Sequence, residues 1–170
     1  MKKFIALLLM VVTLCACLTL TGCNDPITYT AESDFYYSAD KGATYGNRTK
    51  EYSVGETIYM QVMVKVTSTS ETVEAVNVKL TIPNITAVDA KYYDGQIITP
   101  VYDAINNVTT YEFTVPVSNA SKETSFFFQF IPNAEAEVKM TLEFDDKIDS
   151  MYDKQNTVKF VAAETNADGE

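Results

Sequence analysis

A regular alternation of apolar and polar residues runs through most of the chain after Pro26. The pattern is clear in Thr57–Val66, and Val76–Ile82, Tyr111–Val115 and Ala134–Phe144 repeat it. A period of two residues is typical of a β-strand that buries one face, because successive side chains point to opposite sides of a sheet. We therefore predict four strands with these inward-facing residues: Ile58, Met60, Val62, Val64, Val66, Val76, Val78, Leu80, Ile82, Tyr111, Phe113, Val115, Ala134, Ala136, Val138, Met140, Leu142 and Phe144.

Weaker alternation predicts five more strands near Ile27–Ser38, Thr86–Tyr93, Gln96–Tyr102, Ser125–Ile131 and Thr157–Val161. Turn-forming pairs such as Asp94-Gly95 and Pro132-Asn133 separate the predicted strands. Roughly nine short strands at this spacing favour an all-β fold, an antiparallel two-sheet sandwich. Helix is limited to one expected turn at Ile148–Tyr152.

The run Phe126-Phe127-Phe128-Gln129-Phe130 is the most aromatic stretch of the chain. In an extended conformation Phe126, Phe128 and Phe130 share the core face. Phe127 then points to the opposite face, where we expect a loop or a partner to cover it.

The stretch Tyr52–Asn84 contains a turn, Val54-Gly55-Glu56, a polar loop, Thr67–Thr72, and then Ala75–Leu80 before Pro83. In this order they resemble the opening of the Ig-like repeat modules of bacterial surface proteins, including the cell-adhesion-related type. The later run from Val115 to Phe144 is similar to the turns and closing strands of that family. The resemblance implies an Ig-like sandwich that serves as a spacer, an adhesion unit or a docking surface, and it brings no catalytic residue.

The first 23 residues combine a basic start, Lys2 and Lys3, with the apolar run Phe4–Leu20. This combination is typical of an export signal. The residues Leu20-Thr21-Gly22-Cys23 resemble the lipobox of bacterial lipoproteins, with Leu three positions before the cysteine and a small residue directly before it. The resemblance implies that Cys23 carries a diacylglyceryl group, that the preceding peptide is removed, and that a further chain such as palmitate acylates the new amino end. We favour lipidation over a retained transmembrane helix, because Asn24-Asp25-Pro26 breaks a helix.

These features give a domain organisation and a location. We expect a signal peptide at 1–22, a short linker at 23–28, the Ig-like sandwich at 29–162 and a polar tail at 163–170. Cys15 and Cys17 lie in the expected signal peptide and Cys23 would carry lipid, so no disulfide is expected. The predicted location is extracytoplasmic, anchored to a bacterial membrane by lipid.

The formal net charge of −10 excludes some partners. Nucleic acid is not expected, because the sequence offers no basic patch to neutralise phosphates. We attribute the acidity to solubility rather than to a specific cationic ligand.

Residue composition also limits the chemistry of the chain. It has no histidine, no tryptophan and no cysteine beyond the three already named. Histidine-based nucleophilic catalysis and His-ligated metal sites are therefore excluded, and we predict no catalytic residue and no cofactor. A paired-carboxylate hydrolase is a distant alternative.

Four aspartates near the last strands could bind calcium through hard oxygen ligands: Asp145, Asp146, Asp149 and Asp153. Their spacing lacks the turn glycine of a known calcium loop, so we predict no metal site while leaving calcium near Asp145–Asp149 open.

Tyrosines are concentrated early in the exported part of the chain, and Tyr36, Tyr37 and Tyr45 are the candidate ligand-binding residues. Such residues form protein hot spots or stack on sugars. The leading hypothesis is an Ig-like binding or structural module that holds a protein or envelope partner at the membrane surface. The alternative is a small carbohydrate- or ligand-binding lipoprotein that uses a tyrosine-rich face.

Overall fold

The alternating stretches of the sequence form the strands of the computed structural model. The structure describes residues 27–46, 51–69, 75–90, 97–117, 122–145, 148, 150–152 and 156–163, with the backbone alone for 88–90 and 150–152. The predicted signal peptide, Cys23, Asp146, Asp149, Asp153 and nearly all of the predicted tail lie outside these residues. Within them, no helix is long and apolar enough to cross a membrane.

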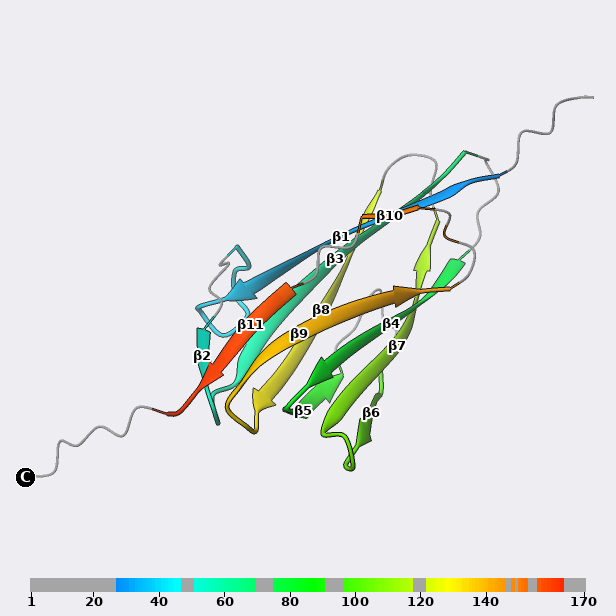
Figure 1. Ribbon diagram of the computed structural model, residues 1–170. Helices are drawn as coiled ribbons and strands as arrows, with labels where there is room; N and C mark the ends of the chain where they lie inside the picture. The colour runs from blue at the N-terminus through cyan, green and yellow to red at the C-terminus, as the bar shows by residue number, and fades with distance from the viewer. Residues whose placement is uncertain are drawn as a thin grey trace, which may run out of the picture.

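The described residues contain eleven strands, which form two sheets. The five-stranded sheet has the order β10 (Ser150–Tyr152), β1 (Tyr29–Ser38), β3 (Ile58–Ser68), β8 (Glu123–Pro132) and β5 (Ile85–Ala90). The six-stranded sheet has the order β2 (Glu51–Ser53), β11 (Asn156–Val161), β9 (Ala136–Phe144), β4 (Ala75–Pro83), β7 (Val108–Pro116) and β6 (Pro100–Asp103). Figure 1 shows the start of β1 at one end of the sandwich and the β6–β7 hairpin at the other end.

The strand order is that of an Ig-like sandwich. Neighbouring strands β1-β3-β8-β5 and β11-β9-β4 reproduce the A-B-E-D and G-F-C orders of constant-type Ig domains, and they occur in the same sequence along the chain. The β6–β7 hairpin is inserted between the D-like and E-like strands and extends the second sheet beyond β4. The predicted fold class is therefore confirmed.

The core lies between the two sheets. The predicted inward-facing residues are buried, apart from Ala134, Ala136 and Phe144, which are half-buried. Aromatic rings join the sheets: the centroids of Phe113 and Phe126 are 4.2 Å apart. Such a pair contributes about 0.5–1.5 kcal/mol beyond the burial of its surface.

Some elements differ from the prediction. Residues 150–152 form strand β10, paired in parallel with β1, where a helical turn was predicted. Strand β2 was not predicted, and it pairs in parallel with β11. Strand β9 begins at Ala136 and not at Ala134. Both parallel strands are three residues long and lie at sheet edges, so pairing with a distant strand and not their own sequence pattern defines them.

Candidate functional site

The outward side chains of three adjacent strands form the surface that we call the β1–β3–β8 face. Its residues are Glu32, Asp34 and Tyr36 from β1, Gln61, Met63 and Lys65 from β3, and Glu123, Ser125 and Phe127 from β8. Strand alternation buries the residues between them and turns these nine outward. All but Glu32 and Glu123 are half-buried, because large neighbouring side chains shield one another.

The register of the strands arranges this face in three rows. One row is Glu32–Lys65–Glu123, the next is Asp34–Met63–Ser125, and the third is Tyr36–Gln61–Phe127. The Lys65 Nζ atom lies 3.5 Å from Glu32 Oε2, and Gln61 Nε2 donates a 3.0 Å hydrogen bond to Ser125 Oγ. Cross-strand pairs of this kind hold the three strands in register.

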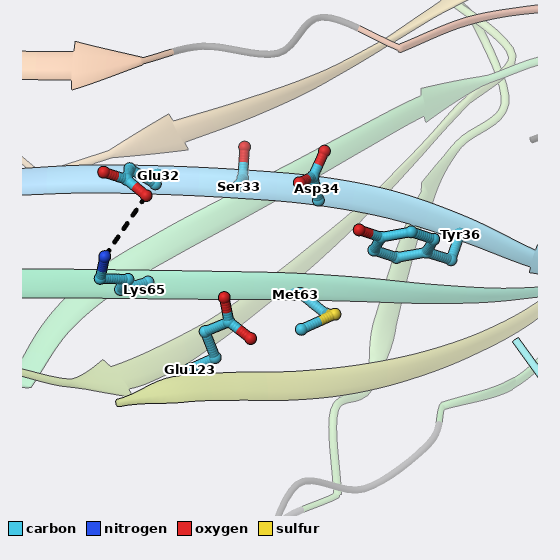
Figure 2. Close-up of a pocket in the computed structure, with 7 residues that line it drawn as sticks. All are labelled: Glu32, Ser33, Asp34, Tyr36, Met63, Lys65 and Glu123. Carbon is cyan, nitrogen blue, oxygen red and sulfur yellow. Dashed lines mark hydrogen bonds and ion pairs between the residues drawn. The ribbon is translucent and has the colours of Figure 1, made fainter. Parts of the chain in front are cut away.

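A depression of about 270 Å³ lies on the β1–β3–β8 face. Its lining residues are Glu32, Ser33, Asp34, Tyr36, Met63, Lys65 and Glu123. In Figure 2, Met63 lies near the middle, the Tyr36 hydroxyl points toward Asp34, and the Glu123 carboxylate extends from β8 toward β3. The depression therefore combines an apolar thioether, an aromatic ring and charged groups of both signs.

The loop after β1 covers one end of this face. The rings of Tyr45 and Phe127 lie 5.1 Å apart, so a loop provides the cover that the sequence predicted for Phe127. Asp40 orders the loop: it accepts hydrogen bonds from Ser38 Oγ at 2.6 Å, Thr44 N at 2.8 Å and Thr44 Oγ1 at 2.7 Å. These bonds stabilise the carboxylate and lower the pKa of Asp40 to about 2.

The three predicted ligand-binding tyrosines do not share one surface. Tyr36 lines the depression, and Tyr45 covers Phe127. Tyr37 is only 2% exposed and belongs to the core, so its placement on a tyrosine-rich face was wrong. Adjacent strand residues point to opposite faces, and this rule alone separates Tyr36 from Tyr37.

The buried Tyr37 hydroxyl joins the two sheets. It accepts a hydrogen bond from Asn156 Nδ2 and lies 3.7 Å from the Met140 sulfur, to which it donates. Burial raises the pKa of Tyr37 far above its usual value, with a further contribution from Tyr52. The hydroxyl therefore stays protonated and acts as a structural link.

Of the residues that line the depression, only Tyr36 was predicted from the sequence. The other six were not: Glu32, Ser33, Asp34, Met63, Lys65 and Glu123. Met63 is the one that the sequence pattern could best have identified as a surface-site residue, since it is apolar at an outward position of Thr57–Val66. The row Glu32–Lys65–Glu123 has no such signal, because it depends on the pairing of three distant segments.

A second depression, of about 490 Å³, lies on the outer side of the six-stranded sheet. We call this surface the β9–β4–β7 face, and its depression is lined by Asn77, Val78, Lys79, Glu112, Phe113, Thr114, Glu143, Phe144 and Asp145. Lys79 pairs in register with Glu112 on one side and Glu143 on the other. This row repeats the charge order of Glu32–Lys65–Glu123.

A third surface is apolar and lies around β6. The exposed large hydrophobic residues there are Ile97, Val101, Tyr102 and Ile105, the last of which is 94% exposed. Asp103 Oδ1 accepts a 2.9 Å hydrogen bond from Ile105 N, which shapes the hairpin tip. Asn107, at φ 51°, donates 3.0 Å hydrogen bonds to the side chains of Asn84 and Asn133 and so ties the tip to two neighbouring turns.

The calcium alternative, which the sequence left open near Asp145–Asp149, depends almost entirely on residues outside the described part of the chain. Asp145 alone is described, and its Oδ2 atom accepts a 3.0 Å hydrogen bond from Asn77 N. Among the described residues there is no group of three or more acidic side chains placed to hold a metal ion.

No protein-family profile matches the sequence, and no curated protein matches it. Among solved structures, the chain is similar to the CARDB domain of a Pyrococcus furiosus protein, with 12% identity and a TM-score of 0.39 over 81% of this chain and 94% of that one. It is also similar to a cohesin module from a Clostridium perfringens family 33 glycoside hydrolase, with 9% identity and a TM-score of 0.44 over 80% of this chain and 100% of that one. A fragment of the major pilin of Streptococcus agalactiae gives 9% identity and a TM-score of 0.33 over 80% of this chain and 56% of that one. At these identities the likenesses bring no binding residue to the chain.

Proposed function

We propose that this protein is a lipid-anchored extracytoplasmic binding module. The Cys23 lipid holds it to a bacterial membrane, and the β1–β3–β8 face holds a protein or envelope partner. The observation that carries the proposal is the depression between Tyr36, Met63 and Glu123 on a face whose side chains are mostly half-buried. Aromatic and Met side chains are enriched at binding surfaces, and here Tyr36 and Met63 lie among the charged side chains of one depression.

The arrangement of the chain supports anchoring close to the membrane. Strand β1 begins at Tyr29, so only a few residues separate Cys23 from the sandwich. At about 3.3–3.6 Å per residue, this linker spans roughly 20 Å when extended. Two or three acyl chains give stable attachment where one chain is marginal.

Detergent partition of the protein expressed in a bacterium tests the anchor. The natural chain is expected in the detergent phase of a Triton X-114 separation, and Cys23→Ser is expected in the aqueous phase. Mass spectrometry of the amino-terminal peptide should find the acyl chains on Cys23. An unmodified Cys23 in the processed protein would refute the anchor.

Photo-crosslinking tests the binding face in cells that make the protein naturally. A photoreactive residue is placed at Ser125 on the β1–β3–β8 face or, as a matched control, at Thr114 on the β9–β4–β7 face, since both positions are half-buried. A discrete adduct is expected from position 125 and not from position 114. Adducts from both positions, or from position 114 alone, would contradict the choice of face.

A second candidate function is capture of a carbohydrate. Tyr36 borders the depression beside Asp34, and a ring next to a carboxylate is able to stack on a sugar and accept its hydroxyl hydrogen bonds. A glycan array tests it with Tyr36→Ala as the variant, because Tyr37→Ala would disrupt the core. Saccharide binding that is lost in Tyr36→Ala favours capture, and a blank array favours a protein partner.

A further inference from the structure

The two depressions carry the same set of charges. On the β1–β3–β8 face, Glu32, Asp34 and Glu123 surround Lys65. On the β9–β4–β7 face, Glu112, Glu143 and Asp145 surround Lys79. Each depression therefore holds more carboxylates than ammonium groups, and each attracts cations more than anions.

The uncharged residues at outward strand positions distinguish the two depressions. The row adjacent to Glu32–Lys65–Glu123 is Asp34–Met63–Ser125, and the Tyr36 ring lies in the row after it. Next to Lys79 lies Asn77, paired with Thr114. The second depression is also lined by Val78, Phe113 and Phe144, but these residues occupy inward positions of their strands. At outward positions the first depression offers a thioether and an aromatic ring, and the second offers an amide and a hydroxyl.

A cationic side chain with an aliphatic stem fits both the negative charge of the first depression and its apolar residues. The stem of a lysine or arginine is able to pack on Met63, because such side chains bury their methylene groups while keeping the charge in water. The cationic head is able to lie against the Tyr36 ring and near the carboxylates. Lys65 already forms an ion pair with Glu32, which leaves Glu123 on the opposite side of Lys65 facing the depression.

We propose that the β1–β3–β8 face binds a basic polypeptide segment and that a lysine or arginine of this segment occupies the depression between Tyr36, Met63 and Glu123. This proposal rests on the proposed function and names the chemistry of its partner. Charge complementarity favours a basic partner, because three carboxylates and only one ammonium group line this depression. An anionic lipid surface or a nucleic acid would be repelled from the same place.

The test uses the mature lipoprotein in a neutral detergent and fluorescein-labelled hexaarginine and hexalysine as probes, with hexaglutamate as the negative control. Fluorescence anisotropy should detect binding of both basic peptides, weakening as salt is added. Glu123→Gln and Tyr36→Ala should each raise the Kd about threefold or more, since one unit of charge or one cation–π contact is lost. Thermal unfolding of each variant checks that the fold is retained.

Glu112→Gln is the matched control, because Glu112 pairs with Lys79 as Glu123 pairs with Lys65. It removes the same charge from the other face and should change the Kd less than twofold. Equal weakening by Glu112→Gln and Glu123→Gln would show bulk attraction only and would overturn the proposal. Failure of both peptides to bind would also overturn it, whereas an adduct from position 125 in the crosslinking experiment would still support the proposed function.

Discussion

The β1–β3–β8 face and the β9–β4–β7 face repeat one charge pattern on different surroundings. Each face has a row in which a lysine lies between two glutamates, and each row borders a depression. Around Lys65 the neighbouring outward residues include Met63 and, one row further, Tyr36 and Phe127. Around Lys79 they are all polar: Asn77 and Thr114 on one side, and Thr81, Thr110 and Thr141 on the other. Charge alone therefore does not separate a binding face from a solvated face, and the difference lies in the apolar surface beside the charges.

Lysine rows on both faces serve the fold as well. Cross-strand pairs of opposite charge favour the native register. A third row, Glu51–Lys159–Glu137, extends the pattern to the edge of the six-stranded sheet. Because such rows occur on both sheets, they have a structural role. Binding on the β1–β3–β8 face would be a second role of one row.

The largest expected effect is at Phe127, whose ring is half-buried and packs on Tyr45. Phe127→Ala should lower the free energy of unfolding by about 2 kcal/mol, through lost apolar burial and the lost ring contact. Thr141→Ala, at a half-buried outward position of β9, should cost less than about 1 kcal/mol. Urea unfolding followed by circular dichroism measures both, and equal losses would show that the two faces are packed alike.

Gly42 tests the loop that covers Phe127. Its φ is 89°, and a Cβ atom there would lie 3.1 Å from Tyr45 Oη and 3.2 Å from Tyr59 Cδ1. Gly55 has φ 86° with nothing within 4 Å of its Cβ position, so it is the control for backbone strain alone. Gly55→Ala should lower the free energy of unfolding by about 1 kcal/mol, and Gly42→Ala should lower it by about 1.5 kcal/mol. A smaller loss at Gly42 than at Gly55 would contradict a firmly packed loop.

Two buried tyrosines extend the comparison to the inner faces of the sheets. Tyr37 of β1 has hydrogen-bond partners in Asn156 and Met140. The Tyr111 hydroxyl of β7 is buried without a hydrogen-bond partner among the described residues. Tyr37→Phe should therefore cost about 1 kcal/mol, while Tyr111→Phe should leave the free energy of unfolding unchanged or raise it. Thermal and urea unfolding give both values, and a clear loss in Tyr111→Phe would indicate a partner for that hydroxyl.

The smallest expected effects are at the two lysines. The side chains of Lys79 and Glu143 are 46% and 62% exposed, and Lys79 Nζ lies 3.4 Å from Glu143 Oε2. The Lys65 side chain is 24% exposed. Exposed ion pairs contribute little, so Lys79→Met and Lys65→Met should each change the free energy of unfolding by about 0.5 kcal/mol or less. A loss well above 1 kcal/mol at Lys65 alone would mean that the β1–β3–β8 face depends on its ion pair for stability.

Much of the candidate site follows from local pattern. The outward position of Met63 and the opposite directions of Tyr36 and Tyr37 are consequences of strand alternation, and so is the need to cover Phe127. Which loop covers Phe127 does not follow, because Tyr45 reaches it only after β1 and β8 take their places in the same sheet.

The sequence by itself determined the long strands and the core, because every second residue of these segments is apolar. The residues predicted to face inward in Ile58–Val66 and Val76–Ile82 are all buried. Tertiary structure decided which strands are neighbours, in what register, and where short edge strands such as β10 and β2 form. Glu32, Lys65 and Glu123 meet for that reason only: pairing between distant segments depends on how the whole core packs, and no local pattern encodes it.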